Sequence, residues 1–102
     1  MTILVMEFTA DFAEDKDAAA KIRDQKIRPA IRDGKEVILD FTGVTLATQS
    51  FIHALVSDVI RTTGESVLTL LKFKGCNKEV KGIVRTVVQY SLEILEDENG
   101  EG

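Results

Sequence analysis

The sequence predicts a small α/β domain with a mainly parallel sheet flanked by helices, in the order βαβαβα. Three short apolar runs rich in strand-forming residues alternate with longer stretches whose apolar residues recur at helical spacing. Each longer stretch can form the helical crossover that parallel strands need, because a tight turn cannot join them. With 102 residues, 44% of them hydrophobic, the chain is expected to form one domain around one core.

The N-terminal part of the chain predicts a strand followed by a helix. Residues 2 to 8 form an apolar run typical of a first strand. A helix is expected over residues 15 to 34, because acidic residues suit its start and a glycine suits its end. Pro29 lies inside this pattern and removes a backbone donor. We therefore expect either a kink near Lys26 or two short helices.

The rest of the chain predicts two more strands and two more helices. Residues 35 to 41 are almost continuously apolar, as in a strand buried on both faces, so helices should cover both sides of the sheet. A helix from Ser50 to Gly64 has its apolar residues on one half of the helical wheel. Residues 66 to 73 form the third predicted strand. The last helix begins near Asn77 and turns these residues inward: Val80, Ile83, Val84, Val87, Val88 and Leu95.

Composition limits the classes of partner and compartment. We expect a domain over residues 1–95 and an acidic disordered tail over residues 96–102, which carry almost no apolar groups. The net charge of −4 and pI near 5.0 disfavour nucleic acid and anionic membranes as partners. The first residues include neither a basic region nor a small-residue cleavage site, and no apolar run approaches the ~20 residues that span a bilayer, so we expect no signal peptide and no membrane span. Cys76 is the one cysteine, which suits a reducing compartment, and we expect a cytoplasmic protein.

The segment ILDFTGVTLATQSFIHALV, residues 38 to 56, carries a specific family pattern. An Asp-Phe strand end is followed by a Gly-Val turn and then by Ser-Phe at the start of a helix. In this order and spacing the segment resembles the STAS-like domains of unknown function. The segments that flank it agree with the same family, so the resemblance covers about residues 18 to 93. It implies a single small STAS-like domain.

The same segment is more distantly similar to the STAS domains of bacterial anti-sigma factor antagonists. In those partner-switching proteins, a histidine-kinase-like ATPase phosphorylates a serine in an Asp-Ser-Ser-Gly loop. This sequence has Thr48, Gln49, Ser50 and Phe51 at the corresponding positions. The resemblance thus puts Gln49, which cannot be phosphorylated, at the position of the phosphoacceptor. A phosphorylation switch would have to use Ser50 or Thr48.

The connection from Thr42 to Gln49 is longer than the roughly 2 to 6 residues usual between a strand and a helix in α/β units. It joins the carboxyl end of a parallel strand, where such folds place their sites, to the start of a helix. One interpretation is purely structural, with Thr48 or Ser50 as the helix cap and Gly43 as the turn residue. The other is a loop that also contacts a partner.

Asp40 ends a predicted buried strand, and its carboxylate must therefore accept hydrogen bonds. The donors expected are loop N–H groups or the hydroxyls of Thr42, Thr45 or Thr48. We favour this structural role over that of a general base, which would need a substrate pocket.

No complete catalytic or metal-binding constellation is present in the sequence. His53, the single histidine, is expected on the solvent face of its helix, without the arrangement of a Ser-His-acid triad. No second histidine or cysteine stands at metal-ligand spacing. Cys76 precedes a helix, where the dipole can lower a thiol pKa, but a half-buried inert thiol is the favoured interpretation. We expect no enzyme activity, no cofactor and no metal.

A basic cluster surrounds the third strand and the last helix, with Glu79 as its acidic neighbour. It can meet an acidic partner, although a solvated surface is the more common meaning of such a cluster. Its members are Lys72, Lys74, Lys78, Lys81 and Arg85.

The leading hypothesis is a non-enzymatic regulatory protein-interaction module. By family resemblance, its partner would be a histidine-kinase-like ATPase or an anti-sigma-like protein. The alternative is a sensor of a small anion or nucleotide, although the chain has no glycine-rich phosphate loop. The sequence leaves the oligomeric state undefined. Asp40 and Gly43 support the site, and the expected partner-binding residues are Thr48, Gln49, Ser50, His53, Ser57 and Arg61.

Overall fold

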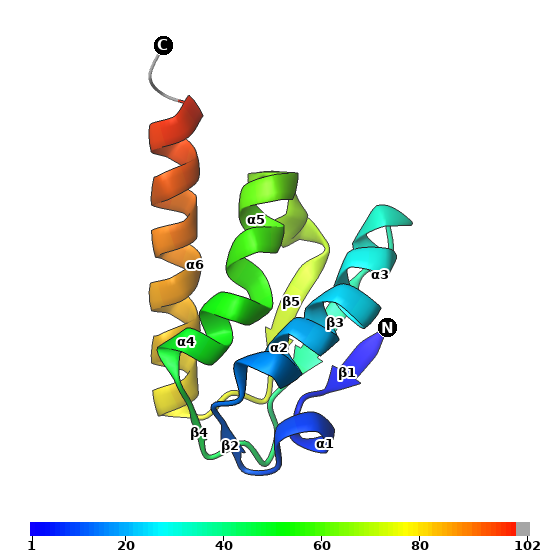
Figure 1. The fold of residues 1–102 in the computed structure, drawn as a ribbon, viewed down its shortest axis with the longest axis vertical. Coiled ribbons are helices and arrows are strands. Elements are labelled where there is room, and N and C mark those ends of the chain that lie inside the picture. The colour runs from blue at the N-terminus through cyan, green and yellow to red at the C-terminus, as the bar shows by residue number, and fades with distance from the viewer. Residues whose placement is uncertain (100–102) are drawn as a thin grey trace.

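The fold is built on a parallel sheet of three strands, in the order β1-β3-β5 (Figure 1). The computed structural model describes residues 1–99. The strands are β1 (Thr2–Leu4), β3 (Val37–Asp40) and β5 (Leu71–Lys74), and both neighbouring pairs are parallel. The predicted α/β class with a mainly parallel sheet flanked by helices is therefore confirmed.

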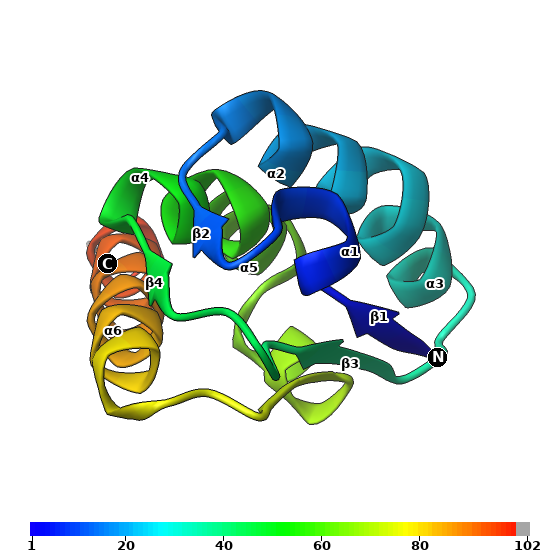
Figure 2. The same ribbon diagram turned by 90° about the horizontal axis from the view of Figure 1, so that it is seen from below.

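The two faces of this sheet differ in polarity. Ile3, Leu39 and Leu71 point to the buried side, while Leu4 and Lys72 are exposed on the other. Figure 2 shows the helices α2 to α5 together on one side of β1 and β3. The expectation that helices cover both faces is wrong, because β5 alternates apolar and lysine residues and so presents one face that water can solvate.

The first crossover is a helix interrupted by a π-helical turn. It consists of α2 (Lys16–Ile22), the π turn η1 (Arg23–Ile27) and α3 (Arg28–Arg32). The predicted distortion near Lys26 thus takes the form of a wide turn rather than a break. The N–H of Arg28 bonds to the Arg23 carbonyl within this wide turn, just before Pro29, which has no N–H to donate.

The second crossover repeats this design. It consists of α4 (Gln49–Ile52), a second π turn η2 (His53–Ser57) and α5 (Asp58–Thr63), followed by Gly64 with a positive φ. The predicted helix from residue 50 to Gly64 is confirmed in its extent. The π turn within it was not predicted.

The third predicted strand begins later than expected. Residues 66 to 69 belong to a 3₁₀ helix, η3 (Glu65–Thr69), and extended structure starts only at Leu71. Strand β3 begins at Val37, which lies opposite Leu71, so the preceding residues have no neighbouring strand with which to pair. The backbone groups of these residues form local hydrogen bonds instead, such as the bond from the Leu70 N–H to the Val67 carbonyl.

The first predicted strand is also shorter than expected. Strand β1 stops at Leu4, opposite the last residue of β3, and a short helix α1 (Met6–Thr9) follows. The next segment contains β2 (Phe12–Ala13), which pairs in parallel with β4 (Leu46–Ala47) to form a second small sheet. This pair cannot be predicted from the sequence pattern, because strands of two residues are too short to show alternation.

The C-terminal helix α6 (Lys78–Asn99) packs beside α4 and α5 (Figure 1). The predicted inward residues Val80, Val84 and Val87 are buried, and the others are half-buried. The helix continues to Asn99, four residues into the predicted disordered tail, and residues 100–102 lie outside the described part. Within residues 1–99, no helix is long and apolar enough to cross a membrane.

Candidate functional site

The long connection between β3 and α4 is an ordered segment. The N–H of Thr45 donates to the Asp11 carbonyl (2.7 Å), and the N–H of Thr48 donates to the Ala13 carbonyl (2.9 Å). From the other side, the side-chain amide of Asn77 donates to the Thr45 carbonyl (2.8 Å), while its Oδ1 caps α6. Hydrogen bonds from two sides therefore hold the connection in one conformation without a bound partner.

Asp40 anchors the turn that opens this connection. Its Oδ1 accepts hydrogen bonds from the Thr42 hydroxyl (2.6 Å) and the Thr42 N–H (2.9 Å), which confirms its expected structural role. Those bonds, with the charge of Lys74, lower the pKa of Asp40 below its ordinary value. Gly43 follows with φ +89°, as expected of the turn residue.

An apolar pair lies exposed where this connection pairs with the segment between α1 and α2. Phe12 and Leu46 are register partners on β2 and β4, and their side chains are 44% and 49% exposed. Their neighbours Ala13 and Ala47 point the other way and are buried. This exposed pair could not be predicted from the sequence, because it depends on the unpredicted pairing of β2 with β4.

The cap of α4 is Thr48 rather than Ser50. Thr48 Oγ1 accepts a hydrogen bond from the N–H of Phe51 (3.0 Å). Ser50 lies in the first turn of the helix and is exposed. Of the two proposed caps, the structure thus selects Thr48 and leaves the Ser50 side chain on the surface.

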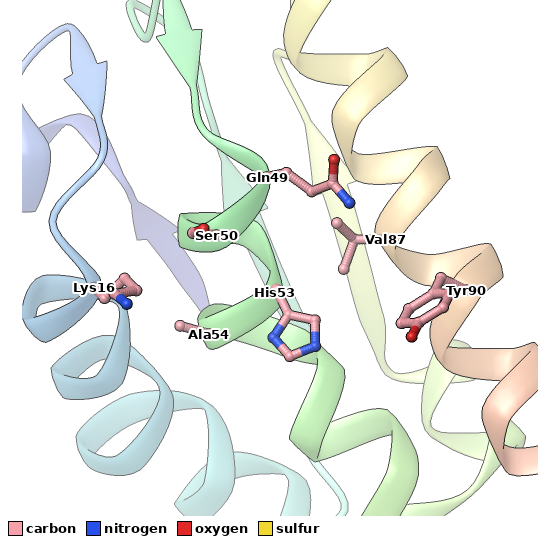
Figure 3. A pocket seen from close by; sticks show the side chains of 7 residues that line it. All are labelled: Lys16, Gln49, Ser50, His53, Ala54, Val87 and Tyr90. Atoms are coloured by element: carbon pink, nitrogen blue, oxygen red, sulfur yellow. The ribbon is translucent and has the colours of Figure 1, made fainter.

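Three predicted partner-binding residues gather at an open pocket of about 470 Å³ between α2, α4 and α6. They are Gln49, Ser50 and His53, all exposed, as was expected for His53. Figure 3 shows Gln49 and His53 extending from the α4 side toward α6, where Val87 and Tyr90 form the opposite wall.

Sequence reasoning missed two polar side chains of this pocket. Lys16 comes from the start of α2, and Tyr90, 52% exposed, comes from α6. Both are far from α4 in sequence, so only the packing of the helices brings them to it. The one sequence signal for Tyr90 is its place on the predicted polar side of the last helix, where a large aromatic residue is unusual.

Ser57, also predicted on this face, is buried. It is fully excluded from solvent, and its hydroxyl is hydrogen bonded to that of Ser91 on α6 (2.8 Å). The prediction assumed an unbroken α-helix, whereas the π turn η2 inserts one residue and rotates the following positions by about 100°. Arg61, beyond this turn, is exposed.

The wide turn η2 is braced by the neighbouring helix. The guanidinium of Arg23, itself in η1, donates to the carbonyl of Ala54 (3.0 Å). Arg28 forms an ion pair with Asp58 at the start of α5. A hydrogen bond from the Arg23 guanidinium to Asp24 raises the pKa of Arg23. These contacts hold η2, the turn that carries His53.

The remaining candidates for chemistry lie elsewhere. Cys76 is half-buried, and burial raises the pKa of its thiol rather than lowering it. Among residues 1–99, no group of three His, Cys, Asp or Glu side chains is arranged to hold a metal ion. The exposed donors and acceptors around α4 can bind a partner surface without any chemical step.

Comparison with known proteins agrees with this architecture. The chain matches no curated protein and no solved structure. Residues 18–81 match the model of a family described as a STAS-like domain of unknown function (DUF4325). The match runs from the first crossover helix through the ordered connection to the start of α6, and so includes the segment on which the resemblance rests. Because it covers more than half of the chain, the protein belongs to this family of STAS-like domains.

Proposed function

We propose that this chain is a non-enzymatic regulatory module that binds a larger signalling protein. The contact surface, called here the docking face, consists of Phe12, Leu46, Gln49, Ser50 and His53. The observation that carries the proposal is the exposed pair of Phe12 and Leu46 on the paired strands β2 and β4, just before the polar start of α4. An apolar centre beside polar groups is the usual composition of a protein-binding surface.

The connection between β3 and α4 is already held in one conformation, and this favours the binding of a partner. Asp11, Ala13 and Asn77 already fix the backbone that carries Leu46, so a partner does not have to restrict a flexible loop. Burial of an exposed aromatic side chain is a common source of interface energy. The docking face thus combines an aromatic anchor with low conformational cost.

The family resemblance suggests a histidine-kinase-like ATPase or an anti-sigma-like protein as the partner. If phosphorylation controls the contact, the acceptor is Ser50 rather than Thr48. The hydroxyl of Ser50 is on the exposed docking face, whereas that of Thr48 is engaged as the cap of α4. A phosphate would add a charge of about −1.5 to −2 in the middle of the contact. Mass spectrometry of the protein from its own cell tests this point, and an unmodified Ser50 under all growth conditions contradicts it.

Site-specific photo-crosslinking in the native cell tests the docking face. A photoreactive phenylalanine analogue at Leu46 is expected to trap one protein partner. The same analogue at Lys35, an exposed position at the amino end of the sheet, serves as the matched control. Crosslinks of equal yield and identity at both positions, or none at Leu46, contradict the proposal.

A small-ligand sensor is the second candidate, because the pocket of about 470 Å³ brings Lys16 and His53 to one open hollow. Thermal shift against phosphate and common nucleotides distinguishes the two functions. A ligand at about 100 times its dissociation constant would add about 2.7 kcal/mol to the free energy of unfolding. A flat response supports protein docking, and a shift abolished by Lys16→Ala supports the sensor.

A further inference from the structure

A second hollow of about 600 Å³ lies between β5 and α6, and none of its lining residues belongs to the docking face. It adjoins another of about 340 Å³ that shares Phe73, Val84 and Arg85 with it. We call the two together the β5 groove. Its floor is apolar: Leu71 and Val84 are buried, and the half-buried members are Leu68, Phe73, Val88 and Leu92.

One wall of the groove is the free edge of the sheet. Strand β5 pairs with β3 and with no other strand among the described residues. The carbonyls of Leu70 and Lys74 accept bonds from the N–H groups of Val37 and Phe41. Because alternate residues of a strand face opposite neighbours, the N–H and C=O groups of Leu71 and Phe73 point outward, toward the groove. This edge offers a template for one more strand.

The rim of the groove is positively charged. Lys72 from β5 and Arg85 from α6 line the larger hollow, and Lys74 and Lys81 line the smaller one. Within residues 1–99, neither Lys72 nor Arg85 takes part in an ion pair or a side-chain hydrogen bond. The groove therefore combines unpaired backbone groups, an apolar floor and unneutralised cations.

We infer that the β5 groove binds an extended acidic segment of a partner protein, which adds to the sheet beside β5. A groove between a strand edge and a helix suits such strand addition, in which backbone bonds give affinity and alternate side chains give specificity. Residues of the segment that face the floor are apolar. The residues between these apolar ones lie on the side of Lys72, because successive side chains of a strand point to opposite faces. They are acidic because their charges complement that of Lys72.

Charge selects this occupant over a second copy of the chain. Pairing of two β5 edges would bring Lys72 and Lys74 of one copy beside the same lysines of the other. Like charges on neighbouring strands are unfavourable, whereas opposite charges stabilise the pair. The site is separate from the docking face, and the two can be tested independently.

The test uses the full chain and a synthetic peptide of about eight residues that alternates valine and glutamate, with blocked ends. Binding is followed by the NMR hydrogen exchange of backbone amides. The amides of Leu71 and Phe73 should exchange at least about tenfold more slowly with peptide bound. The outward amide of Leu4, on the opposite edge strand β1, is the internal control and should not change.

Two charge-reversal variants complete the design. Lys72→Glu/Arg85→Glu should weaken peptide binding by about tenfold, while Lys21→Glu/Lys35→Glu, which changes the net charge equally, should not. A peptide that alternates valine and lysine should fail to bind. Absence of protection at Leu71 and Phe73, equal weakening by both variants, or self-association of the chain through β5 in place of peptide binding would overturn the inference.

Discussion

Replacing Thr48 by alanine removes the side-chain acceptor at the start of α4, where Thr48 Oγ1 lies 3.0 Å from the backbone nitrogen of Phe51. Phe51 is fully buried, so its N–H gains little from water once the cap is lost. Loss of a cap of this kind costs about 0.5 to 2 kcal/mol of unfolding free energy. For a domain of this size, about 1 kcal/mol corresponds to a Tm lower by about 4 to 8 °C.

Ser50→Ala is the matched control, because Ser50 is exposed in the same helical turn and is not the cap. It should change the unfolding free energy by less than about 0.5 kcal/mol. Thr48→Asp should restore the cap and so retain most of the wild-type stability. Chemical denaturation of the three variants measures these differences. A Ser50→Ala loss equal to or larger than that of Thr48→Ala would refute the assignment of the cap.

Three further predictions concern the turn at Asp40 and its surroundings. In denaturant titrations, Gly75→Ala should lower the unfolding free energy more than Gly34→Ala. Both glycines have φ +72°, so the backbone strain of the two substitutions is similar. A Cβ at Gly75 would lie 2.7 Å from Asp40 Oδ1, whereas a Cβ at Gly34 would have no atom within 4 Å. Equal losses would refute the steric argument. Because the pKa of Asp40 is lowered on folding, its carboxylate stabilises the fold above its ordinary pKa of 3.8 and loses this effect as the pH falls further. Asp40→Asn should therefore be less stable than wild type at pH 7, and the difference should shrink below pH about 4; a gap independent of pH would contradict this. The half-buried thiol of Cys76, whose pKa burial raises, should react with iodoacetamide at pH 8 more slowly than a free cysteine peptide, and an equal rate would contradict its burial.

The sequence predicted the elements whose residues show a clear period or a clear stop. The apolar run around Leu39 became the central strand, and Gly64 follows the end of the second crossover helix as predicted. Asp40 was expected to accept nearby hydrogen bonds, and Thr42 supplies two of them. Each of these features is determined by residues that are close together in sequence.

The errors came from features that depend on distant contacts. The position of Ser57 follows from the π turn η2, which the Arg23 contact braces from another helix. Residues before Leu71 could not extend the third strand, because the neighbouring strand begins at Val37. The pairing of β2 with β4, and with it the exposed Phe12, depends on two-residue strands without a periodic signal.

The most direct test of the proposed function is the dissociation constant of the partner trapped at Leu46, measured with purified proteins by calorimetry. Phe12→Ser/Leu46→Ser should weaken binding by at least about tenfold, which is about 1.4 kcal/mol, because it removes the apolar centre of the docking face. Leu4→Ser, which replaces a similarly exposed apolar residue on the open face of the sheet, should leave the dissociation constant unchanged. The account predicts this contrast with all three proteins folded. An unchanged dissociation constant for a folded Phe12→Ser/Leu46→Ser variant would contradict it.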